Sequence, residues 1–442
     1  MGRALTELHI VGGNPLSGEI EVGGRKNSAV AAIPAAILAE GASVLENLPA
    51  IGDVATYSNI LSSIGAKVQR PTWSQMKIDA TNIQPDVTPL EEVKKIRASY
   101  YLLGALLGRF QYARVGLPGG CDIGQRPIDQ HLKGFRALGA DTRIAHGEVI
   151  AQADKLRGAH IYLDVASVGA TINIMYAAVL AEGTTVLENC AKEPHIVDVA
   201  NFLNAMGARV VGAGTDTIKI RGVESLAPAE HAIIPDEIEA ATYAVAAAAT
   251  GGDVILRGVV PKHLDSVSAK LREAGVIIEE NGDWIRVIGN DRPNAINVKT
   301  LPYPGFPTDA MPQMLVLLCR GRGTSVISES IYETRFNHVS ELQRMGTRIH
   351  VEGRTAVVEG VETLHGAPVK ASNLRAGASL VIAGLVAEGT TRVSGIEHVD
   401  RGYEFLEEKL RGVNARLCRH SDGVSEQGEA DCQTTAANIG DG

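Results

Sequence analysis

The chain repeats one pattern at intervals of roughly seventy residues, and this repeat constrains its fold more than any other feature. Each copy begins with a helix of small apolar residues, passes a Gly-rich turn into a β-branched strand, and ends in an amphipathic helix. The clearest copies read AAILAEGASVLENLPAIGDVATYSNILSSIGAKV from Ala35 and AAVLAEGTTVLENCAKEPHIVDVANFLNAMGARV from Ala177. Further copies begin at Tyr101, Ala244, Met314 and Leu380. Six copies predict two sets of three.

The two kinds of helix predict how each copy packs. The first helix is apolar around its whole circumference and should be buried, whereas the second is apolar on one face and should lie against a sheet. We therefore expect an α/β fold of six βαβαβ-like repeats in two domains with helical centres. Residues 22–233 form one domain in this interpretation, and residues 1–21 plus 234–420 form the other. Residues 421–442 are polar and patternless, which predicts a disordered tail.

Composition excludes several classes of function. The 442 residues are 45% apolar and 21% charged, which is enough for two or more cores. A net charge of −9 argues against nucleic-acid or broad membrane partners but allows small anionic ligands. No apolar run approaches roughly 18 residues and the start has no signal-peptide pattern, so we expect a cytoplasmic protein. As a separate expectation, we favour a monomer. HExxH, a P-loop and a strand-linked GxGxxG are all absent from the sequence, so no metal or cofactor is expected.

The segment GLPGGCDIGQRPIDQH, residues 116–131, carries the most specific chemistry. Its glycines and prolines predict an exposed loop, and Arg126 gives Cys121 the cationic neighbour that favours a thiolate. An ordinary surface cysteine is the alternative. The five cysteines are odd in number and scattered, which suits reduced thiols, and we expect the other four to be inert: Cys190, Cys319, Cys418 and Cys432.

The continuation PGGCDIGQRPIDQHLKGFRALGA resembles the active-site loop of the UDP-N-acetylglucosamine 1-carboxyvinyltransferase family. The resemblance runs from Leu8 to about Leu417 and includes GGRKNSAV, SVGATINIM, YPGFPTD, RFNHVSEL, NLRAGA and HVDRGYE in the family order. The segment ASYYLLGALLGRF is similar to the second type of enzyme of this family, which is found in some Gram-positive bacteria. The resemblance implies a two-domain inside-out α/β barrel. It also implies transfer of the enolpyruvyl group of phosphoenolpyruvate to the 3-hydroxyl of UDP-N-acetylglucosamine, the first committed step of peptidoglycan synthesis.

The resemblance also assigns roles to residues. Cys121 would be the general acid that protonates the methylene carbon, and also a nucleophile towards C2, while Asp309 would take the proton of the sugar hydroxyl. A set of cationic residues would hold phosphate and carboxylate: Lys26, Arg97, Arg126, Arg335, Arg375 and Arg401. Of these, Lys26 and Arg401 would also have catalytic roles. The remaining substrate-binding residues would be Asn27, Asp129, Gln130, Ser167, Val168, Gly169, Ile331 and Glu333. His131 would lie at the edge of the site.

Each role has a plainer alternative. A single Lys or Arg is usually a solvated surface charge, although Arg97 and Arg375 have small or apolar neighbours. A turn aspartate such as Asp309 is often only a helix N-cap. His131 could equally be an ordinary histidine on a helix face.

The sequence departs from the family pattern at a few positions. Glu237 stands where Arg is usual and Asn373 where Asp is usual, FPTDAMPQ differs after the Asp, and GVNA replaces Gly-Leu-Gly-Ala. Three rival functions remain: transfer to shikimate-3-phosphate, transfer to another uridine nucleotide, and a catalytically dead paralogue that binds nucleotide or a regulatory protein. The thiol loop argues against the first, and Asn27, Asp129 and SVGA argue against the second.

Overall fold

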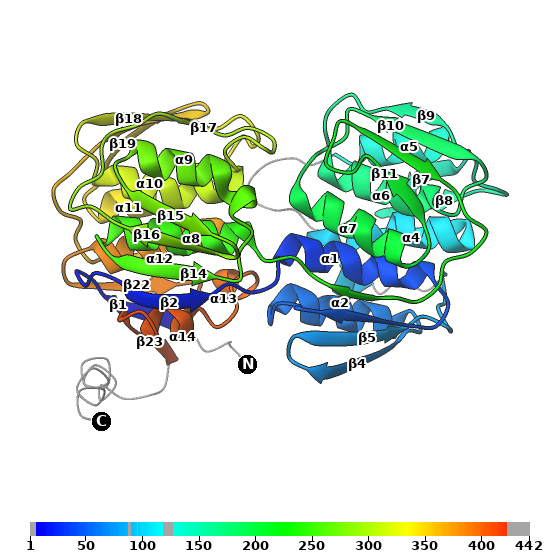
Figure 1. The fold of residues 1–442 in the computed structure, drawn as a ribbon, viewed down its shortest axis with the longest axis horizontal. Coiled ribbons are helices and arrows are strands. Elements are labelled where there is room, and N and C mark those ends of the chain that lie inside the picture. Colours follow the sequence, from blue (N-terminus) through cyan, green and yellow to red (C-terminus); the bar gives the residue numbers. More distant parts are fainter. Residues whose placement is uncertain (1–5, 87–89, 95, 118–126, 422–442) are drawn as a thin grey trace. The chain divides into compact units, whose positions relative to one another are not determined.

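The computed structural model describes residues 6–86, 90–94, 96–117 and 127–421. These residues divide into two compact units (Figure 1). Unit A comprises the described residues from Gly23 to Pro235, and unit B comprises those up to Val22 and those from Asp236. Cys121 and Arg126 lie outside the described residues.

The strands of unit A form three open sheets within the described residues. They are β3 (Ala42–Glu46), β4 (Lys67–Thr72), β5 (Gln75–Asp79), β6 (Tyr112–Gly116), β7 (Asp141–Ala145), β8 (Glu148–Gln152), β9 (His160–Tyr162), β10 (Thr184–Glu188), β11 (Arg209–Val211), β12 (Thr217–Arg221) and β13 (Glu230–Ala232). The strand orders are β13-β3-β5-β4, β6-β8-β7 and β11-β12-β10-β9.

Unit B also forms three open sheets within the described residues, each with four strands. The strands are β1 (Thr6–Val11), β2 (Ser17–Glu21), β14 (Asp253–Arg257), β15 (Ile277–Asn281), β16 (Trp284–Ile288), β17 (Val298–Lys299), β18 (Thr324–Ser328), β19 (Arg348–Glu352), β20 (Thr355–Glu359), β21 (Pro368–Lys370), β22 (Thr390–Ser394) and β23 (Arg416–Ser421). The strand orders are β15-β16-β14-β2, β17-β18-β20-β19 and β21-β22-β1-β23.

Each unit has a helical centre. The central helices of unit A are α1 (Lys26–Ala35), α4 (Tyr101–Phe110) and α6 (Val168–Ala178), and those of unit B are α8 (Glu237–Ala249), α10 (Met311–Cys319) and α12 (Leu374–Val386). Nearly all of their residues are buried. Figure 1 shows such helices enclosed by strands within each unit.

Further helices connect the strands or lie against the sheets. In unit A these are η1 (Ala36–Leu38), α2 (Gly52–Ser63), α3 (Leu90–Val93), η2 (Arg97–Tyr100), α5 (Asp129–Ala137) and α7 (Pro194–Ala205). In unit B they are η3 (Pro261–Leu264), α9 (Asp265–Glu273), η4 (Thr308–Ala310), α11 (Val339–Arg344), α13 (Glu397–Asp400) and α14 (Leu406–Arg411).

Glycines let two central helices of unit A approach closely. A Cβ atom on Gly104 of α4 would lie 2.3 Å from the carbonyl oxygen of Asn173 in α6, and one on Gly108 would lie 2.4 Å from that of Tyr176. Both distances are far below a van der Waals contact. The small residues that mark the repeat in the sequence therefore set the spacing of the core helices.

The predicted α/β class and the sixfold repeat are confirmed, but five of the six sheets in the described residues have four strands, one more than the three predicted for each repeat. Around α6, α10 and α12, the strand before the central helix pairs in parallel with the strand after it, as β9 does with β10, and the antiparallel hairpin of β11 and β12 follows β10. The hairpin turns were missed at positions such as His146-Gly147, where both residues have positive φ and join β7 to β8. The sheets of the described residues are open and form no closed barrel of strands, and the central helices lie inside them as the predicted inside-out arrangement requires.

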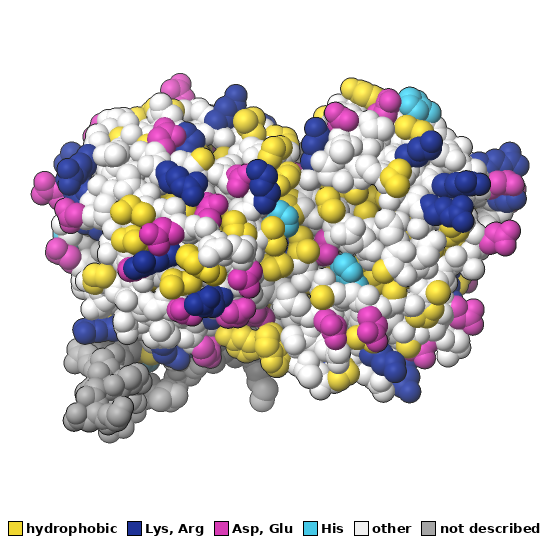
Figure 2. All heavy atoms as spheres, viewed as in Figure 1, with side chains coloured by type: hydrophobic (Ala, Val, Ile, Leu, Met, Phe, Trp, Pro, Cys, Tyr) yellow, Lys and Arg dark blue, Asp and Glu magenta, His cyan; other side chains and the backbone are white. Residues whose placement is uncertain are grey.

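The surface carries charges of both signs. On the face shown in Figure 2, acidic and basic side chains are interspersed, with hydrophobic side chains scattered among them. Among the described residues, no helix is long and apolar enough to cross a membrane.

Candidate active site

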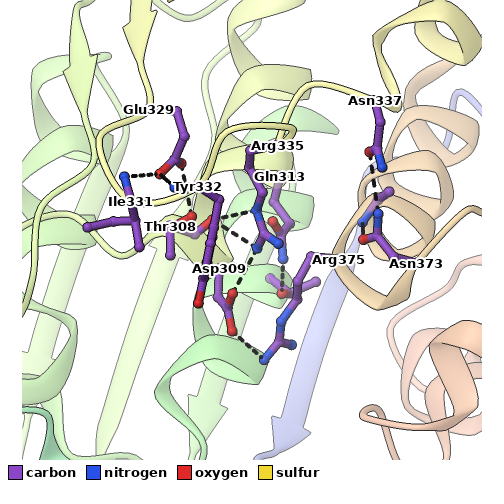
Figure 3. A network of polar contacts seen from close by, with 12 residues as sticks. Thr308, Asp309, Gln313, Glu329, Ile331, Tyr332, Arg335, Asn337, Asn373 and Arg375 are labelled. Atoms are coloured by element: carbon purple, nitrogen blue, oxygen red, sulfur yellow. Dashed lines mark hydrogen bonds and ion pairs between the residues drawn. The ribbon is translucent and has the colours of Figure 1, made fainter. Parts of the chain in front are cut away.

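Asp309 of η4 lies between two buried arginines of unit B (Figure 3). Its Oδ1 accepts a hydrogen bond of 2.7 Å from Nη2 of Arg335, and its Oδ2 accepts one of 3.3 Å from Nη2 of Arg375. The arginine side chains are 3% and 4% exposed, and the aspartate side chain is 29% exposed. The N-cap of η4 is Pro307, so Asp309 does not occupy the capping position that was the alternative for it.

Thr308, beside Asp309, is held by Arg335 and by a further carboxylate, Glu329. Arg335 also donates from Nε and Nη2 to the carbonyl oxygen of Thr308, at 3.3 and 3.1 Å. Glu329, buried just after β18, accepts from the Thr308 hydroxyl at 2.9 Å and from the backbone N–H groups of Ile331 and Tyr332 at 2.6 and 3.1 Å. The turn that carries Asp309 is thus fastened to the segment that carries Arg335.

Arg375, the second residue of α12, is held by a phenol as well as by a carboxylate. Its Nη1 donates to the hydroxyl of Tyr403 at 3.0 Å, and its guanidinium carbon lies 5.3 Å from the centre of the Tyr403 ring. Burial by itself would lower the pKa of Arg375, but Tyr403, Asp309 and Asp236 outweigh it and raise the pKa above its ordinary value. Arg375 is therefore a permanent buried cation.

Asn373 caps helix α12. Its Oδ1 accepts from the backbone N–H of Ala376 at 3.0 Å, and its Nδ2 donates to Ser372 and Asn337 at 3.3 and 3.4 Å. An N-cap needs a side-chain oxygen, which Asn and Asp both supply. The structure therefore gives Asn373 a capping role.

Glu237 is the first residue of α8 and is buried. The N-cap of this helix is Asp236, whose Oδ1 accepts from the N–H groups of Ile238 and Glu239 at 2.8 and 3.1 Å. A negative charge in the first turn of a helix is favoured by the helix dipole. This explains why glutamate is compatible with a position where the family pattern has arginine.

The other predicted residues of unit B lie nearer the surface. Ile331 contributes its backbone N–H to Glu329, and Glu333 forms an exposed ion pair of 2.6 Å with Arg354. Arg401 follows α13 as its C-cap and is exposed. The structure therefore brings Asp309, Arg335 and Arg375 together.

In unit A, the N-terminus of α6 forms a second predicted subsite. Ser167 is the N-cap and accepts from the N–H of Ala170 at 3.3 Å, and Val168 and Gly169 open the helix. A Cβ atom on Gly169 would lie 2.9 Å from the ring of His131 and from the hydroxyl of Tyr100. Only glycine fits here, and the free N–H groups of a helix start are suited to an anion.

His131 is a buried neutral histidine beside this helix start. Asn173 donates from Nδ2 both to Nδ1 of His131, at 3.0 Å, and to the carbonyl oxygen of Gly169, at 3.3 Å. Nδ1 is therefore the acceptor, and Nε2 carries the proton. Burial lowers the pKa of His131 to about 4, opposed by Asp129 and assisted by Arg97. His131 is therefore a buried residue on a face of helix α5.

Gln130 is committed to neighbouring protein groups. Its Nε2 donates to Asp129 at 2.8 Å and to Asp164 at 3.1 Å, while its Oε1 accepts from the N–H of Asp164 at 2.9 Å. Lys133 forms an ion pair of 2.7 Å with the same Asp164. Gln130 therefore orients Asp129, and both ends of its own amide group are hydrogen-bonded to Asp129 and Asp164.

Lys26 begins α1 and forms an ion pair of 2.8 Å with Asp53 of α2. Both side chains are largely buried, at 13% and 8% exposed. Asn27 follows as the second residue of α1 and is partly buried. The lysine is therefore no ordinary surface charge.

The cysteines differ from the expectation at one position. Cys190 and Cys319 are free and buried, and burial raises the pKa of Cys190 to about 12 and raises that of Cys319 as well. Cys418 in β23 is disulfide-bonded, so the expectation of a reduced thiol is wrong there. Within the described residues, no group of three or more His, Cys, Asp or Glu could hold a metal ion.

Comparisons with known proteins decide the family. The EPSP synthase (3-phosphoshikimate 1-carboxyvinyltransferase) family matches residues 10–410. A UDP-N-acetylglucosamine 1-carboxyvinyltransferase 3 of Caldanaerobacter subterraneus is 58% identical over 93% of this chain and 98% of its own length. A UDP-N-acetylglucosamine 1-carboxyvinyltransferase of Clostridium botulinum is 56% identical over 94% of this chain and 100% of its own. The chain belongs to the UDP-N-acetylglucosamine 1-carboxyvinyltransferase family.

Solved structures agree on the fold of this family. The enolpyruvyl transferase NikO from Streptomyces tendae has a TM-score of 0.84 and 27% identity, covering 95% of this chain and 99% of its own. An EPSP synthase from Acinetobacter baumannii has a TM-score of 0.73 at 19% identity, covering 94% and 100%. The second likeness shows the fold alone, and the two-domain α/β fold is confirmed.

Several residues that support the site were not among those predicted from the sequence. Tyr403 contacts Arg375, Glu329 holds the turn of Asp309, and three residues support unit A: Asp53, Asp164 and Asn173. Tyr403 lies in the quoted motif HVDRGYE and Asn173 in SVGATINIM. Motif membership was the available signal for these two.

Replacing Asn373 tests its capping role. Asn373→Ala should lower the free energy of unfolding by about 1 kcal/mol, because the N–H of Ala376 loses its acceptor. Asn373→Asp should stay within roughly 0.5 kcal/mol of the parent, because aspartate caps equally well and its charge suits the helix dipole. Urea unfolding measures both. An equal loss in the aspartate variant would mean that donation to Asn337 dominates instead.

Proposed function

We propose that this chain transfers the enolpyruvyl group of phosphoenolpyruvate to the 3-hydroxyl of UDP-N-acetylglucosamine and releases phosphate. The observation that carries the proposal is the position of Asp309 between two buried arginines in a chain 54–58% identical to relatives with that activity in their names. A buried guanidinium pair suits the phosphate or carboxylate of the donor. A carboxylate beside that pair suits removal of a proton from a hydroxyl.

The proposed reaction is an addition followed by an elimination. The thiol of Cys121 gives its proton to the methylene carbon, the sugar hydroxyl attacks C2, and Asp309 takes the hydroxyl proton. In the elimination, the thiolate of Cys121 takes back a proton from the methyl group, and phosphate leaves with the proton held by Asp309, which forms the enol ether of the product. In the covalent side path the thiolate attacks C2 itself.

We assign the remaining residues as follows. Lys26 and Arg401 assist the chemistry, and the arginines hold the donor: Arg97, Arg126, Arg335 and Arg375. Asn27 binds the sugar, Asp129 binds the uracil with Gln130 orienting it, and the turn Ser167–Gly169 binds the diphosphate through backbone N–H groups. Ile331 and Glu333 contact the nucleotide sugar.

We also propose the setting of the reaction. The enzyme acts as a cytoplasmic monomer in the first committed step of peptidoglycan synthesis, and so supports cell-wall biogenesis, cell shape and division. Its partners are the two small substrates, with no nucleic acid and no membrane. Size-exclusion chromatography with light scattering tests the monomer, and a dimer mass would refute that part.

Acceptor choice separates this proposal from its rivals. UDP-N-acetylglucosamine should support phosphate release from phosphoenolpyruvate at least roughly a hundredfold faster than shikimate-3-phosphate or UMP, because buried polar groups reject an acceptor that leaves them unpaired. A coupled phosphate assay with the three acceptors measures this. Equal turnover with either rival would overturn the assignment, and no turnover with any acceptor would favour the dead paralogue.

Thiol labelling tests the proposed acid. The epoxide fosfomycin should alkylate Cys121 once, and phosphoenolpyruvate should slow the labelling. The other free thiols resist, because burial raises the pKa of Cys190 to about 12 and Cys319 is fully buried. Peptide mass spectrometry locates the label, with Cys121→Ser as control. A label on Cys190 or Cys319 would contradict the assignment.

Replacing Asp309 tests the proposed base. Asp309→Asn keeps the shape between the arginines but cannot accept the proton, so kcat should fall by roughly a hundredfold to ten-thousandfold while nucleotide affinity changes little. Stopped assays and calorimetry measure the two effects. Glu19→Gln is the matched control, because Glu19 is an exposed carboxylate paired with Arg257 in the same unit. Unchanged turnover in Asp309→Asn would exclude the role.

A further inference from the structure

A buried network of neutral side chains lies behind Arg375. The hydroxyl of Tyr403 accepts from Nη1 of Arg375 at 3.0 Å and from Nε2 of Gln313 at 3.2 Å, and it lies 2.8 Å from Oγ1 of Thr242. Nε2 of Gln313 also donates to Oγ1 of Thr242 at 3.0 Å. Each of the four side chains is at most 4% exposed.

The hydrogen positions in this network follow from its donors. Thr242 donates its own proton to the carbonyl oxygen of Ile238 at 2.8 Å, so it cannot also donate to Tyr403. The Tyr403 hydroxyl therefore donates to Thr242, and its lone pairs face Arg375 and Gln313. The Tyr403 hydroxyl thus donates one hydrogen bond and accepts two, and these three contacts fix the direction of its O–H bond.

The network joins the three central helices of unit B. Thr242 belongs to α8, Gln313 to α10 and Arg375 to α12, and Tyr403 follows α13. Buried hydrogen bonds are strong because the surroundings have a low dielectric constant, and rigid helices hold their ends in place. Tyr403 is thus held by hydrogen bonds with α8 and α10. Its own hydrogen bond with Arg375 in turn holds the guanidinium group of α12.

A phenol holds an arginine differently from a carboxylate. It supplies a neutral oxygen to Nη1 and, at 5.3 Å, an aromatic ring near the cation, so that it orients the group and leaves its charge uncancelled. The opposite edge, Nη2, faces Asp309. We propose that Tyr403, held by Thr242 and Gln313, is a positioning residue that sets the orientation in which Arg375 binds the anionic donor. This inference rests on the proposed function.

The main test is Tyr403→Phe, which keeps the ring and removes the oxygen. The KM for phosphoenolpyruvate and its dissociation constant should rise by about tenfold, the scale of one hydrogen bond to a charged group, while kcat stays within roughly threefold. The dissociation constant of UDP-N-acetylglucosamine should not change. A purely structural role would instead lower Tm and move the constants of both substrates together.

A matched pair of variants tests the network behind the phenol. Thr242→Val keeps the size of the side chain but removes the hydroxyl that orients Tyr403, and it should raise the donor KM several-fold, whereas Thr242→Ser should restore the parent value. Tyr176→Phe is the control for losing a buried tyrosine hydroxyl, because Tyr176 lies in unit A, where its hydroxyl donates to the backbone carbonyl of Ala31. It should leave the donor KM unchanged. The valine and serine pair also decides the question if Tyr403→Phe does not fold.

The outcomes separate this inference from the proposed function. Calorimetry with phosphoenolpyruvate alone gives a readout that does not depend on the acceptor. If the parent protein binds the donor and both Tyr403→Phe and Thr242→Val bind it equally well, the inference is wrong and the proposed function stands. If turnover with UDP-N-acetylglucosamine fails but donor affinity falls as expected, the inference stands and the acceptor is wrong. A parent protein that does not bind the donor overturns both.

Discussion

The candidate site of unit B depends on the ion pairs that Asp309 forms with Arg335 and Arg375. Two guanidinium groups that are 3% and 4% exposed would be costly to bury without partners. One aspartate is shared between them, and the remaining hydrogen bonds go to the carbonyl oxygen of Thr308 and the hydroxyl of Tyr403. The turn of η4 and the start of α12 are therefore fixed relative to each other by the same charges that the proposed chemistry uses.

Close packing of the central helices fixes the positions of the functional groups at their ends. The central helices of each unit are built from small residues, and in unit A a Cβ on Gly104 or Gly108 would collide with the backbone of α6. Such close packing leaves few alternative positions for the helix ends that carry functional groups. The anion-suited start of α6 and the cap of α12 both lie at such ends. Rigid elements thus present the groups, while the thiol belongs to a Gly-rich segment.

The sequence predicted what depends on local pattern and missed what depends on long-range contact. The helical periodicity identified the repeats, and the motifs YPGFPTD and NLRAGA identified Asp309 and Arg375. The partners of Tyr403 could not be inferred, because Thr242 is 161 residues away in the chain. The hydrogen bond from Asn373 to Asn337 could not be inferred for the same reason, because the two residues are 36 positions apart in the chain. The extra hairpin strand was missed because its turns use residues such as His146 at positive φ.

The geometry also suggests an order of events under the proposed function. The donor anion and Asp309 compete for the same two guanidinium groups, and the contact of Asp309 with Arg375, at 3.3 Å, is the longer of its two. Under the proposed function, a phosphate or carboxylate that binds Nη2 of Arg375 would take the place of Asp309 there, so that Asp309 would keep one cationic neighbour, Arg335. A carboxylate with fewer cationic neighbours is a stronger base. Because the network behind Tyr403 keeps Arg375 in place, the exchange moves the aspartate and not the arginine, and donor binding prepares the base for the acceptor hydroxyl.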